Sequence, residues 1–180
     1  MSAPAQQRPL WLLDIDGVVN ALATTALSAP WSIGQWIQRT VFAPIDGRGL
    51  VTLPVLAARP VLDFITSVHE SGAAEIRWHT TWRGAAITHL APVLGLPQFP
   101  MSIAPEWQTR TDSFSWKIPA ARRAVAAGRR LLWTEDALAG HGLPDATAAG
   151  LDDALLISPQ SEIGLTPSNL ASIAGWLSPV

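Results

Sequence analysis

The sequence predicts an α/β fold in which helices cover a mainly parallel sheet. Short apolar segments of strand length alternate along the chain with segments of helical periodicity. Several of the apolar segments end in polar residues, as parallel strands do when their carboxyl ends face a ligand crevice. The chain has 180 residues, 48% of them hydrophobic and 14% charged, which fits one compact domain over residues 1–180.

Composition narrows the possible functions. The formal charge of −2 predicts no broad surface for nucleic-acid binding. The chain contains no cysteine, which excludes disulfides, thiolate metal ligands and cysteine nucleophiles. Residues 1–9 are polar, and we expect a flexible tail there rather than a signal sequence. No segment has the roughly 18 uncharged apolar residues of a membrane-spanning helix, so we expect a cytoplasmic protein with no membrane partner.

Residues 10–20 contain the most informative pattern. The apolar run 10–13 predicts a buried strand, and Asp14, Asp16 and Gly17 follow it. Like charges at the tip of a buried strand are costly unless they serve a function. Residues i and i+2 of an extended chain point the same way, so both carboxylates can converge on one metal ion or phosphoryl group. Gly17 allows the chain to turn sharply away from them.

The same residues could instead form a surface turn or part of a calcium loop. An EF-hand loop starting at Asp14 would place Val18 and Thr25 at its fifth and twelfth positions, where oxygen ligands and a Glu are required. A surface turn fits poorly because the residues on both sides are apolar. A catalytic pair of carboxylates is the better interpretation.

The remaining elements follow in order along the chain. Residues 31–42 and 49–55 are rich in β-branched and aromatic residues and flank an Asp-Gly turn, which predicts a β-hairpin over 31–55. Residues 60–70 have amphipathic spacing between Pro60 and a Ser-Gly stop, which predicts a helix. We further expect strands over 75–79, 130–133 and 154–157, and helices over 82–90 (ending before Pro92), 115–127 and 167–177.

Polar candidates cluster where three of these strands end, and one lysine begins a helix between them. Carboxylates bind hard cations, while hydroxyl and ammonium groups bind phosphoryl oxygens. Unit charges about 4 Å apart interact by about 4 kcal/mol at an effective dielectric near 20, so these carboxylates would repel a phosphate monoester without a divalent cation. The candidates are Asp14 and Asp16, then Thr80, then Lys117 (the only lysine), then Glu135 and Asp136.

In this order the motifs resemble those of the haloacid dehalogenase (HAD) superfamily of phosphatases. The segments 12–18, 76–80 and 131–136, together with Lys117, carry the resemblance. Residues 12–20 and 78–83 are also similar to a small bacterial and phage group, some relatives of which are associated with RNA-end repair. The resemblance implies a Rossmann-like HAD fold in which the 31–55 hairpin is a small insertion in place of a large cap.

The resemblance also implies a role for each candidate residue. Asp14 would be the nucleophile that forms an aspartyl-phosphate, and Asp16 the general acid and base. Thr80 and Lys117 would bind the phosphate. Mg²⁺ would be the cofactor, with no other cofactor required. Its implied ligands are Asp14, Asp16 (through the backbone carbonyl), Glu135 and Asp136, with the direct ligand among the last two left open.

We therefore expect a Mg²⁺-dependent phosphatase that hydrolyses a phosphomonoester, with a small molecule or a nucleic-acid end as its phosphorylated substrate. The presence of Asp16 favours phosphoryl transfer over dehalogenation. One alternative is a polynucleotide-end or nucleotide phosphatase, which would use the arginines at 122, 123, 129 and 130 as a basic surface beside the site. Another is a non-catalytic HAD-fold binding or regulatory module. Arg83 is expected either to contact a phosphate or to lie on a solvated helix, and His79 to be a packed histidine.

Overall fold

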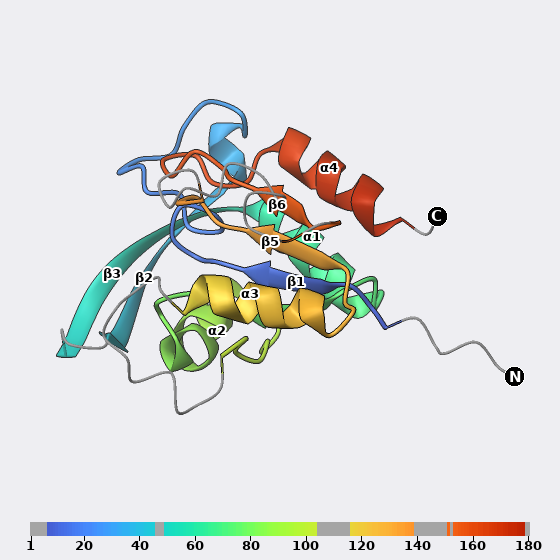
Figure 1. The fold of residues 1–180 in the computed structure, drawn as a ribbon. Helices are drawn as coiled ribbons and strands as arrows, with labels where there is room; N and C mark the ends of the chain where they lie inside the picture. The colour runs from blue at the N-terminus through green and yellow to red at the C-terminus, as the bar shows by residue number, and fades with distance from the viewer. Residues whose placement is uncertain (1–6, 46–48, 104–115, 139–150, 152, 179–180) are drawn as a thin grey trace, which may run out of the picture.

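The computed structural model describes residues 7–45, 49–103, 116–138, 151 and 153–178. The α/β class with a parallel sheet is confirmed. Strands β1 (Leu10–Leu13), β4 (Glu75–Trp78), β5 (Leu131–Thr134) and β6 (Leu155–Ile157) pair in the order β4-β1-β5-β6, all parallel. Figure 1 shows β1, β5 and β6 side by side. Most of the tail expected at 1–9, the hairpin turn at 46–48 and the start of the helix expected at 115–127 lie outside the described residues.

Helices cover both faces of this sheet. Alternate side chains of β1 point to opposite faces, and all of them are apolar and buried. Leu10 and Leu12 pack in one core with α3 (Lys117–Ala126). Trp11 and Leu13 pack in a larger core with α1 (Arg59–Glu70) and α4 (Pro167–Leu177). The carboxyl ends of β1, β4 and β5 are thus brought to one edge of the sheet between two helical layers (Figure 1). No helix among the described residues has the length and hydrophobicity needed to cross a membrane.

The predicted hairpin is confirmed, with shifted bounds. It consists of β2 (Trp36–Ile45) and β3 (Gly49–Ala58), paired antiparallel in a separate two-stranded sheet that projects from the body of the protein (Figure 1). The first strand starts later than expected because a short 3₁₀ turn, η1 (Ile33–Gln35), precedes it. The second strand runs directly into α1. A backbone hydrogen bond of 2.8 Å, from the amide of Ala21 to the carbonyl of Leu56, links the loop after β1 to the hairpin.

The prediction that the helix over 82–90 ends before Pro92 is wrong. A π-helical segment, η2 (Ala86–Leu90), continues into α2 (Ala91–Leu94), so the helix passes through Pro92 and ends at Gly95 with φ 70°. Proline lacks an N–H and its ring clashes with the carbonyl four residues earlier in a regular α-helix. A wider π-helical turn before Pro92 removes the requirement for that contact, so the helix need not stop.

Candidate active site

The loop after β1 is built from one tight turn. The amides of Val18, Val19 and Asn20 all donate to the carbonyl of Ile15, at 3.1, 2.9 and 2.9 Å. Gly17 has φ 71°, and a Cβ there would lie 2.1 Å from Oδ2 of Asp136. A side chain at this position is therefore excluded both by the backbone conformation and by the adjacent carboxylate. The turn places Asn20 beside Asp16.

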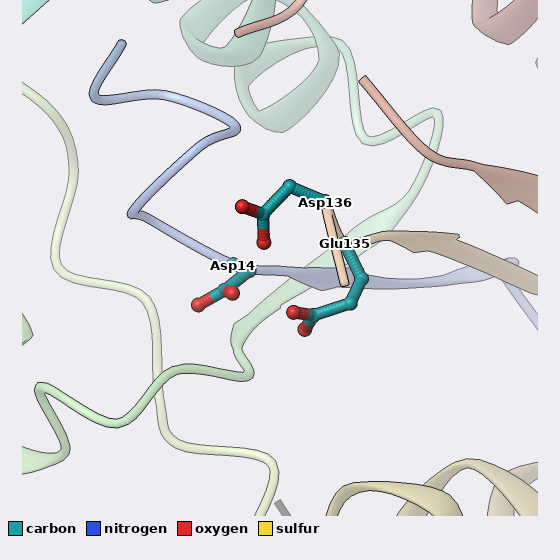
Figure 2. Close-up of side chains that lie close together, drawn as sticks. All are labelled: Asp14, Glu135 and Asp136. Atoms are coloured by element: carbon teal, nitrogen blue, oxygen red, sulfur yellow. The ribbon is translucent and has the colours of Figure 1, made fainter. Parts of the chain in front are cut away.

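Three carboxylates meet at the ends of the adjacent strands β1 and β5. One oxygen from each of Asp14, Glu135 and Asp136 lies within 4.8 Å of the others (Figure 2). Asp14 and Glu135 are buried, and Asp136 is half-buried. Hard oxygen donors at this spacing are the ligands that Mg²⁺ prefers, with water completing its coordination. The structure thus brings together three of the four predicted metal ligands, while the side chain of Asp16 is not part of this group.

Lys117 neutralises part of the charge of this cluster. It is the first residue of α3 and its side chain is only 2% exposed. Its Nζ donates to Oδ2 of Asp14 at 2.9 Å and to Oε2 of Glu135 at 2.5 Å. Burial alone would lower the pKa of Lys117, but the two carboxylates raise it, so the side chain remains an ammonium ion. Lys117 is therefore paired with the predicted nucleophile, as the resemblance implies.

The pKa of Glu135 reflects the crowding of negative charge. Burial and the neighbouring Asp14 raise this pKa to about 9, against the opposing effect of Lys117. Without a bound cation, burial and the charge of Asp14 therefore favour the protonated form of Glu135. A divalent cation would displace that proton, because a carboxylate must be ionised to bind a metal.

Asp16 is held separately by two side-chain donors. Its Oδ1 accepts from Nδ2 of Asn20 and its Oδ2 from Nε1 of Trp82, both at 2.9 Å. Asn20 in turn accepts from the amide of Leu56 in β3, at 2.9 Å. Burial raises the pKa of Asp16 and the charges of Asp14 and Asp136 add to this, whereas the two hydrogen bonds lower it. The net effect is a raised pKa on a carboxyl group in a fixed orientation.

The residues after β4 agree only in part with what the sequence predicts for them. Thr80 is 1% exposed, and its Oγ accepts from the amide of Trp82 at 3.3 Å. The solvated position considered for Arg83 is wrong, since this residue is 7% exposed with φ 51°. His79 is a packed histidine, as expected: its Nδ1 lies 2.6 Å from Oγ of Ser102. Burial lowers the pKa of His79 well below its ordinary value, so the ring is neutral.

Sequence reasoning missed three residues that hold the predicted site residues in place. Asn20 and Trp82 bind Asp16, and Oγ of Ser161 donates to Oδ2 of Asp136 at 2.7 Å. Ser161 follows β6, the last strand of the same parallel sheet. The position of Ser161 shortly after a strand is the sequence signal that could have indicated its role. Trp82 lies 66 residues from Asp16 in the chain, and no local pattern indicates their contact.

Two of the four clustered arginines lie away from this site. Arg129 and Arg130 immediately precede β5 and are thus at the opposite edge of the sheet from Asp14. Arg129 pairs with Glu75, Nη1 to Oε2 at 2.7 Å. Arg130 donates to the carbonyl of Trp176 at 2.7 Å and stacks over its ring. These two arginines do not form a basic surface beside the carboxylates.

Comparison with known proteins gives no relative: no family model, no curated protein and no solved structure matches the chain. A functional interpretation therefore depends on the geometry of the site and on the motif pattern of the sequence.

Replacing Asp136 with Asn tests whether the three carboxylates bind a metal. The change removes one charge from an acidic cluster, so we expect the metal-free protein to gain about 1 kcal/mol of stability. A ligand at about 100 times its Kd stabilises a protein by about 2.7 kcal/mol, and we expect the variant to lose this response to Mg²⁺. Thermal unfolding with and without Mg²⁺ measures both effects. Asp63→Asn, an exposed position on α1, is the control; an unchanged response to Mg²⁺ in Asp136→Asn would contradict the metal site.

Proposed function

We propose that this protein is a Mg²⁺-dependent phosphatase of the HAD superfamily that hydrolyses a phosphomonoester through an aspartyl-phosphate. The arrangement around Asp14 is the observation that carries this proposal. A buried carboxylate directly follows the inner strand β1, its Oδ2 is bound by a buried lysine, and a second carboxyl group with a raised pKa stands two residues away. A nucleophile, its charge partner and a general acid are the groups that phosphoryl transfer to a carboxylate requires.

Asp14, Glu135 and Asp136 would hold the metal ion, and their oxygen donors fit Mg²⁺. The bound ion would supply positive charge to the phosphoryl oxygens as negative charge develops on them. Asp16 already accepts hydrogen bonds on both carboxylate oxygens, which leaves its backbone carbonyl as the group through which it would contact the ion.

The chain's own residues would carry out two displacements. An oxygen of Asp14 forms a bond to phosphorus while the bond from phosphorus to the alcohol oxygen breaks. Asp16 donates its proton to that departing oxygen. Asp16 then takes a proton from water, the water oxygen bonds to phosphorus, and Asp14 is released as a carboxylate. Lys117 orients Asp14 through Oδ2 and lowers its repulsion with the phosphate.

Asp16→Asn separates an enzyme from a non-catalytic module. Loss of general acid–base catalysis is expected to reduce turnover of an alkyl phosphate about 10²–10⁴-fold. Mg²⁺ binding should survive, because the Asp16 side chain is not in the carboxylate group that would hold the ion. Steady-state hydrolysis and the Mg²⁺-induced shift in melting temperature are the two measurements. Turnover equal to wild type would show that the proposed mechanism is wrong.

Trp82→Phe tests the assignment through a pH profile. The hydrogen bond from Trp82 lowers the pKa of Asp16, so its removal is expected to raise that pKa further. If protonated Asp16 is the acid, the alkaline limb of the kcat profile moves to higher pH. Trp31→Phe is the matched control, because Trp31 is a buried tryptophan that donates instead to the carbonyl of Leu165, at 3.0 Å. A shift in the control alone, or in neither variant, would contradict the role of Asp16.

Arg129 and Arg130 give no support to a polynucleotide end as substrate, because their side chains form contacts at the opposite edge of the sheet from Asp14.

A further inference from the structure

A pocket of about 210 Å³ lies between the hairpin and the loop after β1. We call it the hairpin pocket; residues 20–24, 38 and 54–56 line it. Leu22, Thr24, Gln38 and Pro54 in its lining are exposed, so the pocket opens to the protein surface. The described contacts of the carboxylate cluster do not involve these residues, and the pocket is a separate feature of the site region.

Asn20 connects the hairpin pocket to the proposed general acid. It lines the pocket and, at the same time, donates to Oδ1 of Asp16 at 2.9 Å. The amide of Leu56, another lining residue, donates to Oδ1 of Asn20 at 2.9 Å. One residue of the pocket wall, Asn20, is therefore hydrogen-bonded directly to Asp16, the proposed general acid. Asn20 thus places the hairpin pocket on the side of Asp16 that carries Oδ1.

The lining defines the chemistry of the occupant. Leu22, Pro54 and Leu56 supply apolar surface, and Thr24 and Gln38 supply neutral polar groups. No charged residue is among the described residues that line the pocket. An occupant with a second charged group would be desolvated there without a partner, which is costly. An apolar cavity of about 150 Å³ is large enough for benzene, so this pocket has room for one ring.

We propose that the hairpin pocket binds the leaving group of the substrate, and that the substrate is the phosphate monoester of an uncharged alcohol carrying an apolar group about the size of one ring. This assignment rests on the proposed phosphatase activity. It places substrate selection in the hairpin and in the loop after β1, with Asn20 linking selection to proton transfer.

Benzyl phosphate and ethyl phosphate test the proposal, because both release an alkoxide and differ in the ring. We expect wild type to favour benzyl phosphate in kcat/KM by about 10-fold or more, in line with the selectivity of apolar pockets. Gln38→Trp would fill the pocket and reduce this ratio about 10-fold. Thr52→Trp is the matched control, since Thr52 is exposed on the same face of the hairpin, nearer its tip, and does not line the pocket. The ratio should be unchanged in it.

A binding measurement without turnover complements the kinetics. We expect saturation-transfer NMR to detect benzyl alcohol binding to Asp14→Asn, and the signal to be lost when Gln38→Trp is added. Turnover of both phosphates with equal kcat/KM would overturn the pocket assignment and leave the phosphatase standing. If Mg²⁺ supports turnover of neither ester, the proposed function fails and the leaving-group assignment with it. Absence of benzyl alcohol binding would overturn the pocket as an apolar site in either case.

Discussion

Asp14→Asn is expected to abolish phosphatase activity while leaving the protein folded. An amide oxygen is a poor nucleophile towards phosphorus, and loss of a nucleophile in a covalent mechanism typically costs at least about 10⁴-fold in kcat. The fold should be retained because Asn is close in shape to Asp and Lys117 keeps its bond to Glu135, at 2.5 Å. Hydrolysis of an aryl phosphate with and without Mg²⁺ measures the loss.

Asp153→Asn provides the control for this experiment, since Asp153 is exposed and precedes β6 at the opposite edge of the sheet from the site. We expect the control to retain wild-type turnover. Activity of Asp14→Asn within about 10-fold of wild type would be inconsistent with covalent catalysis by this residue.

Lys117→Met is expected to have the largest effect on stability. The substitution leaves Asp14 and Glu135 buried without their cation, and removing one partner of a buried ion pair typically costs about 3–5 kcal/mol. Because Lys117 lowers the pKa of Glu135, its loss would raise that pKa further above the value in the unfolded protein. A raised folded-state pKa makes stability fall as pH rises above the unfolded value, so the loss should be greater at pH 8 than at pH 5.

Urea unfolding at the two pH values, followed by tryptophan fluorescence, measures this effect. The double variant Lys117→Met/Glu135→Gln is the informative comparison, because it removes one of the two unpaired carboxylates. We expect it to be more stable than Lys117→Met alone at pH 8. Equal stability of Lys117→Met and wild type at pH 8 would show that the buried ion pair does not contribute as inferred.

The fold could be predicted where local pattern and tertiary packing agree. The helix α1 has Pro60 at its start and buries Val61 and Leu62 on one face, so its apolar spacing was sufficient to predict its position in the chain. The hairpin was also predictable, since its strand residues flank an Asp-Gly pair. The path of the chain through Pro92 was not, because it depends on a π-helical turn that no residue preference marks.

The candidate site divides in the same way. Asp14 and Glu135 could be brought together in advance because parallel strands end at one edge of a sheet. The pairing of Lys117 with Asp14 was implied by the motif resemblance and not by the sheet. The contacts that orient Asp16 come from side chains whose types are common in proteins and whose positions are set by tertiary packing. Trp82 reaches Asp16 across the fold, and its spacing in the chain carries no information about that contact.

The central claim is that Asp14 receives the phosphoryl group, and acid quenching of Asp16→Asn during reaction with an aryl phosphate tests it most directly. An aryl oxide leaves without a proton, whereas hydrolysis of the phosphoenzyme needs Asp16 as base, so the intermediate should accumulate in this variant. We expect a burst of one equivalent of aryl alcohol, and mass spectrometry should place the phosphoryl group on the peptide that contains Asp14. Sustained Mg²⁺-dependent turnover with no phosphoryl group on that peptide would contradict it.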